Sequence, residues 1–254
     1  MKKYAIITDI HGNIEGLNAI LNDIKQKDVD DIFCLGDTID LGLNSKECID
    51  VLMENNIKTI LGNHELYLLR GTDIDKSIEG EEKEHCKWTK SNLTDKEVNF
   101  IKSCPLYYKV NISYENNSEK EIILCHYLIK DEKLEQPFEE NNLKNDINLW
   151  IKYNNPNIIY IIGHLHKNFD ANEVNGISGD IIEEIGELSN IEIVESSGCS
   201  YDEYVSYMII EIDRTIKFEK VKVRFDRYKF INKIINTDFP DKKNILKNFY
   251  NEEI

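Results

Sequence analysis

Long apolar runs are absent from this 254-residue sequence, although 41% of its residues are hydrophobic. No stretch reaches the roughly 18–20 apolar residues that a membrane-spanning helix needs. The N-terminal lysines precede only the short stretch YAII before Thr8 and Asp9 follow, and this is too short for the core of a signal peptide. We therefore expect a globular cytoplasmic protein that folds as a single domain over residues 1–254.

Cysteines are few and scattered, and no two of them form a CxxC pair. Several lie inside apolar segments such as DIFCLGD and IILCH. This pattern argues against a disulfide framework or a zinc knuckle, and it predicts reduced thiols that are mostly buried.

Positive charge is also scarce, because 31 Lys and Arg residues face 47 Asp and Glu residues, for a net charge of −16. An acidic surface repels phosphate backbones, so broad binding to nucleic acid is disfavoured. A phosphorylated substrate would need a local positive centre on this protein.

The first seventy residues alternate between strand-like and helix-like apolar patterns. Strands are expected at 2–8, 31–37 and 57–65, and helices at 13–27 and 45–56. Strands separated by helices of this length imply βαβ units and a parallel sheet.

The rest of the chain is more mixed. We expect a helical insertion at 72–105 whose second helix is capped by Thr94, and a hairpin at 106–126 that turns at 116–118. A helix at 146–155, a buried strand at 156–166, antiparallel strands at 191–198, 204–213 and 215–223, and a helical extension at 227–254 follow. These patterns predict an α/β fold around one or two packed sheets.

Polar side chains that can bind metals follow the predicted strands. They are Asp9, His11, Asp37, Asn63, His64, His126, His164 and His166. Because ligands at the carboxyl ends of strands converge on one edge of an α/β sheet, we expect these side chains to lie together.

The spacing of the last two histidines carries its own prediction. In an extended chain, His164 and His166 share one face about 7 Å apart along the backbone, and Leu165 points into the packing. This separation suits one histidine for each of two neighbouring ions better than chelation of a single ion.

The residue types indicate borderline divalent metals, because imidazole nitrogens are combined with carboxylate and amide oxygens and no thiol. Seven ligands with one bridging Asp would suit two ions about 3.5–4 Å apart. Two such ions outweigh the charges of Asp9 and Asp37, and they lower the pKa of bound water. This chemistry predicts hydrolysis of a phosphate ester.

Each signal alone has an ordinary explanation. An Asp after a strand often caps the next helix, Asn13 could do the same, and Gly followed by Asp or Asn is common in turns. The joint pattern, with every signal in this order and at a strand end, favours a metal site.

The blocks DIH, GD, GNHE, H and GHLH resemble those of the calcineurin-like metallophosphoesterase superfamily, over about residues 4–210. DIHGNIEGLNAIL, and Trp88 followed by a helix and Cys104–Pro105, resemble its small bacterial phosphodiesterase-type branch. The resemblance implies a four-layer α/β/β/α sandwich of two mixed sheets.

The resemblance also implies roles for the site residues. Asp9, His11 and His166 would bind one metal, Asn63, His126 and His164 the other, and Asp37 would bridge them. His64 would contact the phosphate or protonate the leaving oxygen as a general acid. The ions would be divalent or trivalent, and Mn, Fe, Zn and Ni all suit the ligands.

The sequence departs from the family's protein Ser/Thr phosphatases at two positions where they carry arginine. Leu41 and Leu61 stand there instead, which argues against phosphoprotein substrates. We therefore expect a phosphohydrolase that cleaves a small phosphodiester or phosphoanhydride, such as a nucleotide or dinucleoside polyphosphate, by attack of a metal-bridging hydroxide. A protein phosphatase and an inactive metal-binding scaffold are the alternatives.

Two further residues are candidate substrate contacts. Asn13 follows the first block, and His85 lies in the acidic segment EEKEHCKW. His85 would face solvent on a helix, or, if this segment covers the metals, it or Lys87 would contact the substrate. Neither the substrate nor the oligomeric state can be read from the sequence.

Overall fold

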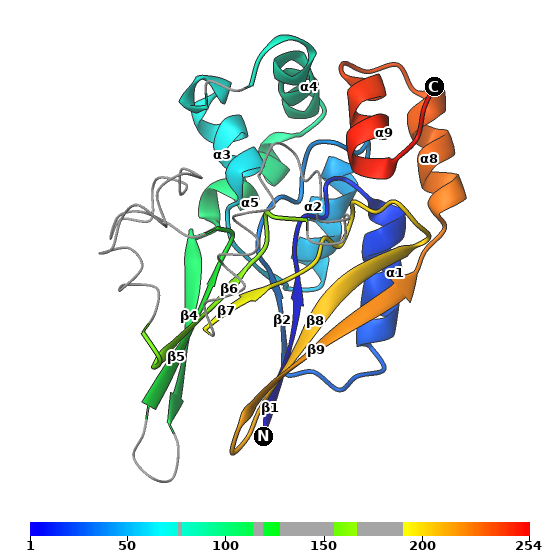
Figure 1. The fold of residues 1–254 in the computed structure, drawn as a ribbon. Helices are drawn as coiled ribbons and strands as arrows, with labels where there is room; N and C mark the ends of the chain where they lie inside the picture. The colour runs from blue at the N-terminus through cyan, green and yellow to red at the C-terminus, as the bar shows by residue number, and fades with distance from the viewer. Residues whose placement is uncertain (76–77, 114–118, 128–154, 167–189) are drawn as a thin grey trace.

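The computed structural model describes residues 1–254 except 76–77, 114–118, 128–154 and 167–189 (Figure 1). Its strands are β1 (Lys2–Ile7), β2 (Asp31–Cys34), β3 (Lys58–Thr59), β4 (Tyr107–Ser113), β5 (Glu119–Cys125), β6 (Ile158–Ile162), β7 (Ile191–Ile193), β8 (Tyr204–Ile212) and β9 (Ile216–Arg224). Its helices are α1 (Ile14–Ile24), α2 (Ser45–Glu54), α3 (Asn63–Arg70), the 3₁₀ turn η1 (Thr72–Ile74), α4 (Gly80–Ser91), α5 (Asp95–Ser103), α8 (Arg227–Asn236) and α9 (Lys242–Tyr250).

Two mixed sheets form the centre of the fold, which confirms the expected fold class. The first has the order β3-β2-β1-β8-β9, with β1, β2 and β3 parallel and β8 and β9 antiparallel. The second has the order β4-β5-β6-β7, in which β4 and β5 form the predicted hairpin and β5, β6 and β7 run parallel.

Strand β1 shows why the two sheets pack together. Its side chains alternate between two buried surfaces, so Tyr4 and Ile6 contact the second sheet while Ala5 and Ile7 face the helices. The cluster between the sheets also includes Leu124 of β5 and Ile161 of β6. With apolar residues on both faces, β1 reads as a continuous buried run.

The predictions for the strands at 57–65 and 191–198 were partly wrong. Strand β3 has only two residues, and Asn63 begins helix α3 instead of ending a strand. Strand β7 was expected to be antiparallel but pairs in parallel with β6, through the register Tyr160–Ile191. An alternating apolar pattern does not report strand direction, which depends on how the chain returns to the sheet.

The helices predicted at 72–105 and 227–254 are present as α4, α5, α8 and α9. Thr94 caps α5, and its N–H donates to Glu97 Oε2 at 2.8 Å. The helix expected at 146–155 and the turn at 116–118 lie outside the described residues, except Asn155. The cysteines are free thiols, and in the described parts of the chain no helix is long and apolar enough to cross a membrane.

Candidate metal centre

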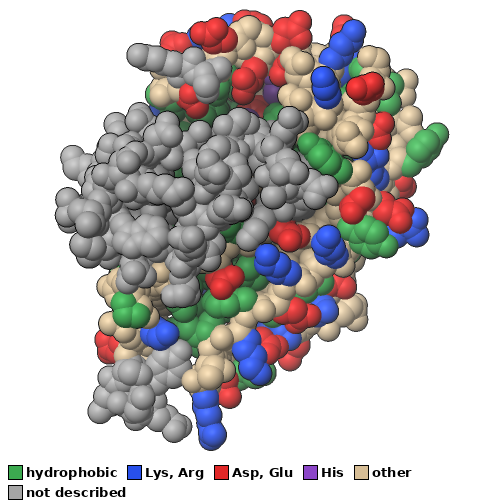
Figure 2. Space-filling view, viewed as in Figure 1, with side chains coloured by type: hydrophobic (Ala, Val, Ile, Leu, Met, Phe, Trp, Pro, Cys, Tyr) green, Lys and Arg blue, Asp and Glu red, His purple; other side chains and the backbone are tan. Residues whose placement is uncertain are grey.

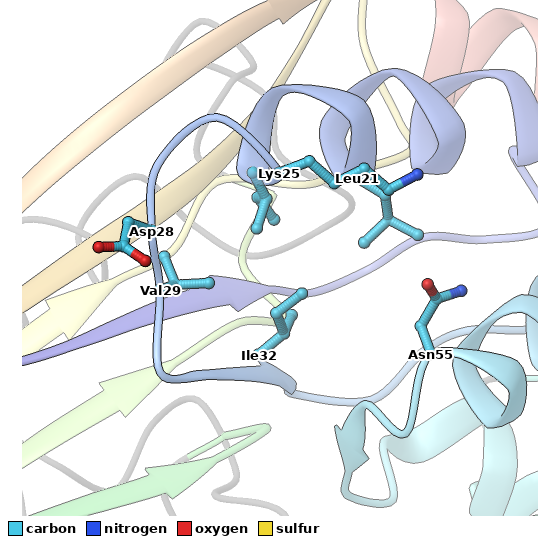
Figure 3. A pocket seen from close by; sticks show the side chains of 7 residues that line it. Leu21, Lys25, Asp28, Val29, Ile32 and Asn55 are labelled. Carbon is cyan, nitrogen blue, oxygen red and sulfur yellow. The ribbon is translucent and has the colours of Figure 1, made fainter.

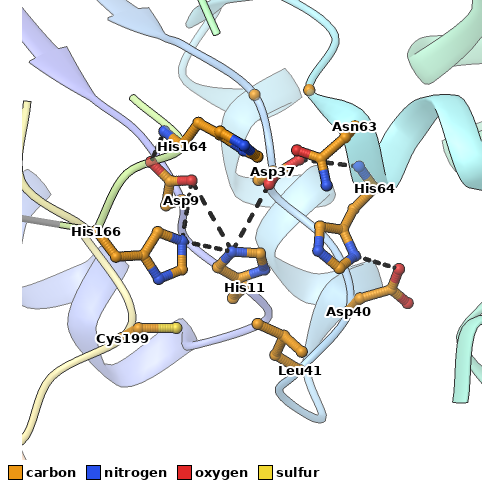
Figure 4. Close-up of polar contacts among 12 residues, drawn as sticks. Asp9, His11, Asp37, Asp40, Leu41, Asn63, His64, His164, His166 and Cys199 are labelled. Carbon is orange, nitrogen blue, oxygen red and sulfur yellow. Dashed lines mark hydrogen bonds and ion pairs between the residues drawn. The ribbon is translucent and has the colours of Figure 1, made fainter. Parts of the chain in front are cut away.

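The predicted ligands meet where β1, β2, β5 and β6 end (Figure 4). His126 Nε2 lies 3.1 Å from Asp37 Oδ2 and 3.0 Å from Asn63 Oδ1. His166 Nε2 lies 3.1 Å from both Asp9 Oδ1 and His11 Nε2. Donor atoms from segments more than 150 residues apart in the sequence therefore face one another.

Asp37 stands between two groups of nitrogen donors. Its Oδ2 is 3.8 Å from His11 Nε2 on one side and 3.1 Å from His126 Nε2 on the other. Asp37 also forms a compact set of candidate ligand atoms with His126 and His164. A carboxylate in this position is suited to bridge two ions.

The backbone around these side chains is unusual. Five of the predicted ligands have positive φ angles between 44° and 65°: Asp9, His11, Asp37, His164 and His166. Few residues other than glycine adopt this left-handed conformation, and it is often retained at functional sites.

The extended geometry expected for His164 and His166 was wrong. Strand β6 ends at Ile162, and both histidines lie in the turn that follows. The N–H of His164 donates to Asp9 Oδ2 at 3.0 Å, while buried Leu165 points into the packing as expected. The turn still directs the two rings to different partners, because His164 packs against His126 and His166 contacts Asp9.

Burial and charge divide the histidines into two protonation classes. Burial would lower the pKa of His126 and of His166, but Asp37 raises the first to about 9 and Asp9 raises the second to about 10. Burial lowers the pKa of His11 to about 3, assisted by the charge of His64, and lowers that of His164 to about 4. The pKa of Asp37 is held well below its ordinary value, because its histidine neighbours outweigh burial.

Glu65 holds the loop that carries Asp37. Its carboxylate accepts the N–H groups of Asp37, Thr38 and Gly62 at 2.8–2.9 Å, although it is 2% exposed. Glu65 was not predicted as a site residue, and its place in the GNHE block was the only signal for it.

His64 lies at the start of α3, beside the predicted ligands. Its N–H donates to Asp37 Oδ1 at 3.0 Å, and its Nδ1 is 2.8 Å from Asp40 Oδ2. Burial would lower the pKa of His64, but Asp37 and Asp40 raise it to about 9. Because Asp40 engages Nδ1 of the His64 ring, Nε2 remains available to donate or accept a proton. Asp40 was not predicted either.

The two candidate substrate contacts are both buried and hydrogen-bonded within the protein. Asn13 Oδ1 accepts the N–H of Gly16 at 2.8 Å, and its Nδ2 donates to the Gly198 carbonyl at 2.7 Å. This arrangement matches the helix-cap alternative. His85 is 1% exposed and accepts the N–H of Leu41 on Nε2 at 2.9 Å, so the solvent-facing alternative was wrong.

Cys199 is a neighbour of the site that the sequence analysis missed. Its thiol lies within 4.8 Å of a ring nitrogen of His11 and of His166, and Figure 4 places it below the His166 ring. It is fully buried beside the Tyr250 hydroxyl of α9, at 3.7 Å. Only its position directly after the strand predicted at 191–198 pointed to this region.

A hollow elsewhere on the surface lies between the end of α1 and the start of β2 (Figure 3). It is lined by Leu21, Ile24, Lys25, Asp28, Val29, Ile32 and Asn55. It sits where β2 begins, so it is at the opposite edge of the sheet from the metal ligands. One lysine, one carboxylate and one amide among four apolar side chains indicate no particular chemistry there.

Comparisons with known proteins point to a single family. The family described as calcineurin-like phosphoesterase matches residues 2–194. An uncharacterised protein of Methanocaldococcus jannaschii is 29% identical over 93% of each chain. The symmetrical bis(5'-nucleosyl)-tetraphosphatase of Actinobacillus pleuropneumoniae is 37% identical, but only over 67 residues, a quarter of each chain.

Solved structures share the fold at low sequence identity. A metallophosphoesterase from Sphaerobacter thermophilus superposes with a TM-score of 0.62 at 18% identity, covering 97% of this chain and 98% of its own. A hypothetical protein from Pyrococcus horikoshii gives 0.69 at 15% identity, with both chains covered completely. These two likenesses support the two-sheet architecture.

Proposed function

The chain belongs to the calcineurin-like phosphoesterase family, and from this membership we propose a dinuclear metal-dependent phosphohydrolase that acts on a small phosphodiester or phosphoanhydride. The observation that carries the proposal is the position of Asp37 between two groups of donors, with Oδ2 3.8 Å from His11 and 3.1 Å from His126. A mononuclear site would not need a carboxylate shared in this way.

The donor set fits borderline divalent ions. Asp9, His11 and His166 would hold one ion, Asn63, His126 and His164 the other, and Asp37 would contact both. Buried carboxylates, imidazoles and an amide suit Mn, Fe, Zn or Ni. When bound, such ions supply positive charge for the phosphate and activate water as a nucleophile near neutral pH.

His64 supplies the proton in this proposal. With a pKa of about 9, its ring is protonated at neutral pH, and Asp40 engages Nδ1. A water oxygen bonds to phosphorus as the bond to the leaving oxygen breaks, and the proton on Nε2 passes to that leaving oxygen. This leaves a neutral imidazole and releases an alcohol from a phosphodiester or a phosphate from a phosphoanhydride. Asp40 accepts the Nδ1 proton and orients the ring, so that the proton on Nε2 is the one transferred.

The choice of substrate class rests on two observations. Leu41 and Leu61 replace arginines of the protein phosphatases, so a phosphoprotein would lose two charged contacts. The partial relative from Actinobacillus is named for a bis(5'-nucleosyl) tetraphosphate, which makes dinucleoside polyphosphates the first nucleotides to test. An inactive scaffold is disfavoured because all seven ligand positions of the family's motif blocks and His64 are intact in the sequence.

The bridging role is tested with Asp37→Asn and Asn63→Ala. Both variants should abolish Mn²⁺-supported hydrolysis of bis-p-nitrophenyl phosphate and lower the bound metal, measured by elemental analysis, because each removes a ligand. Asp31→Asn is the matched control, since Asp31 begins the same strand β2 in an exposed ion pair with Lys58. Full activity in Asp37→Asn would contradict the dinuclear proposal.

A substrate panel separates the alternatives. With Mn²⁺, we expect turnover of phosphodiesters or dinucleoside polyphosphates and little turnover of a phosphoserine peptide. Preferential hydrolysis of the peptide would favour a protein phosphatase, and metal binding without turnover of any substrate would favour the scaffold.

A further inference from the structure

Helix α4 is connected to His64 through the turn at Asp40 and Leu41. His85 on α4 accepts the Leu41 N–H on Nε2 at 2.9 Å, and Asp40 Oδ2 lies 2.8 Å from His64 Nδ1. Figure 4 shows Asp40 reaching the His64 ring, with Leu41 next along the loop. We propose that His85 is a positioning residue, which holds this turn so that Asp40 orients His64 for proton donation. The proposal rests on the proposed function of His64.

The turn has a conformation that needs support. Asp40 and Leu41 have φ angles of +64° and +57°, and a bulky residue such as leucine rarely adopts positive φ. Such conformations persist where surrounding contacts determine them. The Asp40 N–H donates to Ser45 Oγ at 3.2 Å, and His85 accepts the next N–H along the chain.

His85 is itself held firmly. Its ring stacks on Trp88 with centroids 5.8 Å apart and planes at 20°, and it lies 5.4 Å from the ring of Phe239. Phe239 belongs to the connection between α8 and α9, and its ring is 5.4 Å from that of Trp88. The helical insertion and the C-terminal helices therefore meet at the residue that supports the turn.

The position of His85 makes a direct substrate contact a weaker explanation. Its Nε2 faces the backbone of Leu41 and lies 4.0 Å from Asp40 Oδ1, and the residue is 1% exposed. A substrate would have to displace the Asp40–Leu41 turn to reach this nitrogen. Action through Asp40 needs no such movement.

Leaving-group dependence distinguishes positioning from simple packing. A general acid matters most when the leaving oxygen is basic, and little when it is a stable nitrophenolate. A variant that only loosens the fold lowers both rates alike. A variant that disorients His64 therefore lowers turnover of a phenyl phosphodiester far more than that of the p-nitrophenyl ester.

His85→Leu and His85→Gln form the central pair. Leucine fills the space but cannot accept the Leu41 N–H, whereas the glutamine amide oxygen can. With Mn²⁺-loaded protein, we expect His85→Leu to lower kcat about 10–100-fold for the phenyl ester, less than about 5-fold for the p-nitrophenyl ester, and to leave KM unchanged. His85→Gln should stay within about 3-fold of the parent protein for both esters.

Two controls test whether the effect is specific to His85 on α4 and whether it acts through Asp40. Glu84→Ala alters an exposed α4 residue paired with Lys87, and should change neither rate. Asp40→Asn should reproduce the leaving-group dependence, and adding His85→Leu to it should lower kcat by less than a further factor of about 2, because both changes act on one contact. If His85→Leu does not fold, His85→Asn, whose amide is too short to reach Leu41, replaces it with the same expectation.

Several outcomes would overturn the proposal. For His85→Leu, these outcomes are an equal fall in kcat for both esters, an increase in KM with kcat unchanged, or unchanged rates. Additive losses in the double variant would also reject it. If the parent protein hydrolyses no phosphodiester or nucleotide with Mn²⁺, the proposed function fails. If the parent is active and His85→Leu is indistinguishable from it, only the role of His85 fails.

Discussion

At the scale of single residues, the buried carboxylates of Asp37 and Asp9 set the pKa values of two site histidines. Asp37 and Asp9 raise the pKa values of His126 and His166 to about 9 and about 10, against the lowering effect of burial. Both values lie above the ordinary histidine pKa of 6.5, so in metal-free protein these rings are protonated at neutral pH. Their ion pairs with Asp37 and Asp9 then lie at the centre of the candidate metal site.

Proton release should accompany metal binding. A histidine must be neutral to bind a metal, so Mn²⁺ binding near pH 7.5 should release about two protons, from His126 and His166. Titration calorimetry in buffers of different ionisation enthalpy measures this number. The variant His166→Gln should release about one proton fewer, and binding without proton release would contradict the assigned ligands.

The same pKa values set the pH dependence of the metal-free protein. Raised histidine pKa values contribute stability that is complete below pH 6.5, the ordinary pKa of histidine, and is lost as the pH rises through about 9 and 10. The free energy of unfolding of chelator-treated protein, from urea titrations, should therefore fall between pH 6.5 and 10. A rise over this range would contradict the ion pairs.

At the scale of elements, the loop between β7 and β8 supports the loop after β1. Ser196 Oγ donates to the Asp9 carbonyl at 2.9 Å, and Ser197 Oγ accepts the Thr8 N–H at 3.1 Å. A side chain at Gly198 would collide with the carbonyl of Ile10. A loop that carries none of the seven predicted ligands therefore holds the loop that carries Asp9.

Gly198→Ala should accordingly damage both stability and metal binding. Because the obstacle is backbone, we expect a loss of about 1–3 kcal/mol in the free energy of unfolding and a lower metal content. Gly80→Ala is the control, since nothing lies within 4 Å of an added Cβ there and only its φ of +56° opposes the change. Metal contents that match in the two variants would contradict this role for the loop.

The helices and strands also show where the local apolar pattern no longer predicts secondary structure correctly. Periodicity predicted α1, α2 and the terminal helices, because each buries one face against the sheet. It failed at 57–65, where the chain turns after Thr59 and Gly62 approaches Asp37 too closely for any side chain. That approach depends on a segment 25 residues away, which no local pattern contains.

At the scale of the whole molecule, the C-terminal helices complete the main core. Phe230 and Ile234 of α8, with Leu246 and Tyr250 of α9, are at most 1% exposed in the same cluster as Leu17 of α1. Figure 1 shows these helices beside the upper end of α1. The extension is therefore part of the core and not an appendage.

Phe230→Ala should measure this contribution. Removing a fully buried ring should cost about 3–5 kcal/mol of the free energy of unfolding, measured by urea denaturation. Tyr228→Ala is the matched control on the same helix, because Tyr228 is 81% exposed, and it should change stability by less than about 0.5 kcal/mol. Equal midpoints would mean that α8 contributes little to the core.

The sequence patterns determined the residue types of the candidate site, the α/β class and most of the helices, and the family resemblance implied the two-sheet sandwich. Candidate metal ligands at the ends of buried strands are local features, because residue type and apolar period can both be read from adjacent positions. Only the tertiary structure decided the direction of β7, the left-handed turns that aim the ligands, and the contacts of Asp40, His85 and Cys199. These depend on which distant segments pack together, and a pattern within one segment carries no information about its partner.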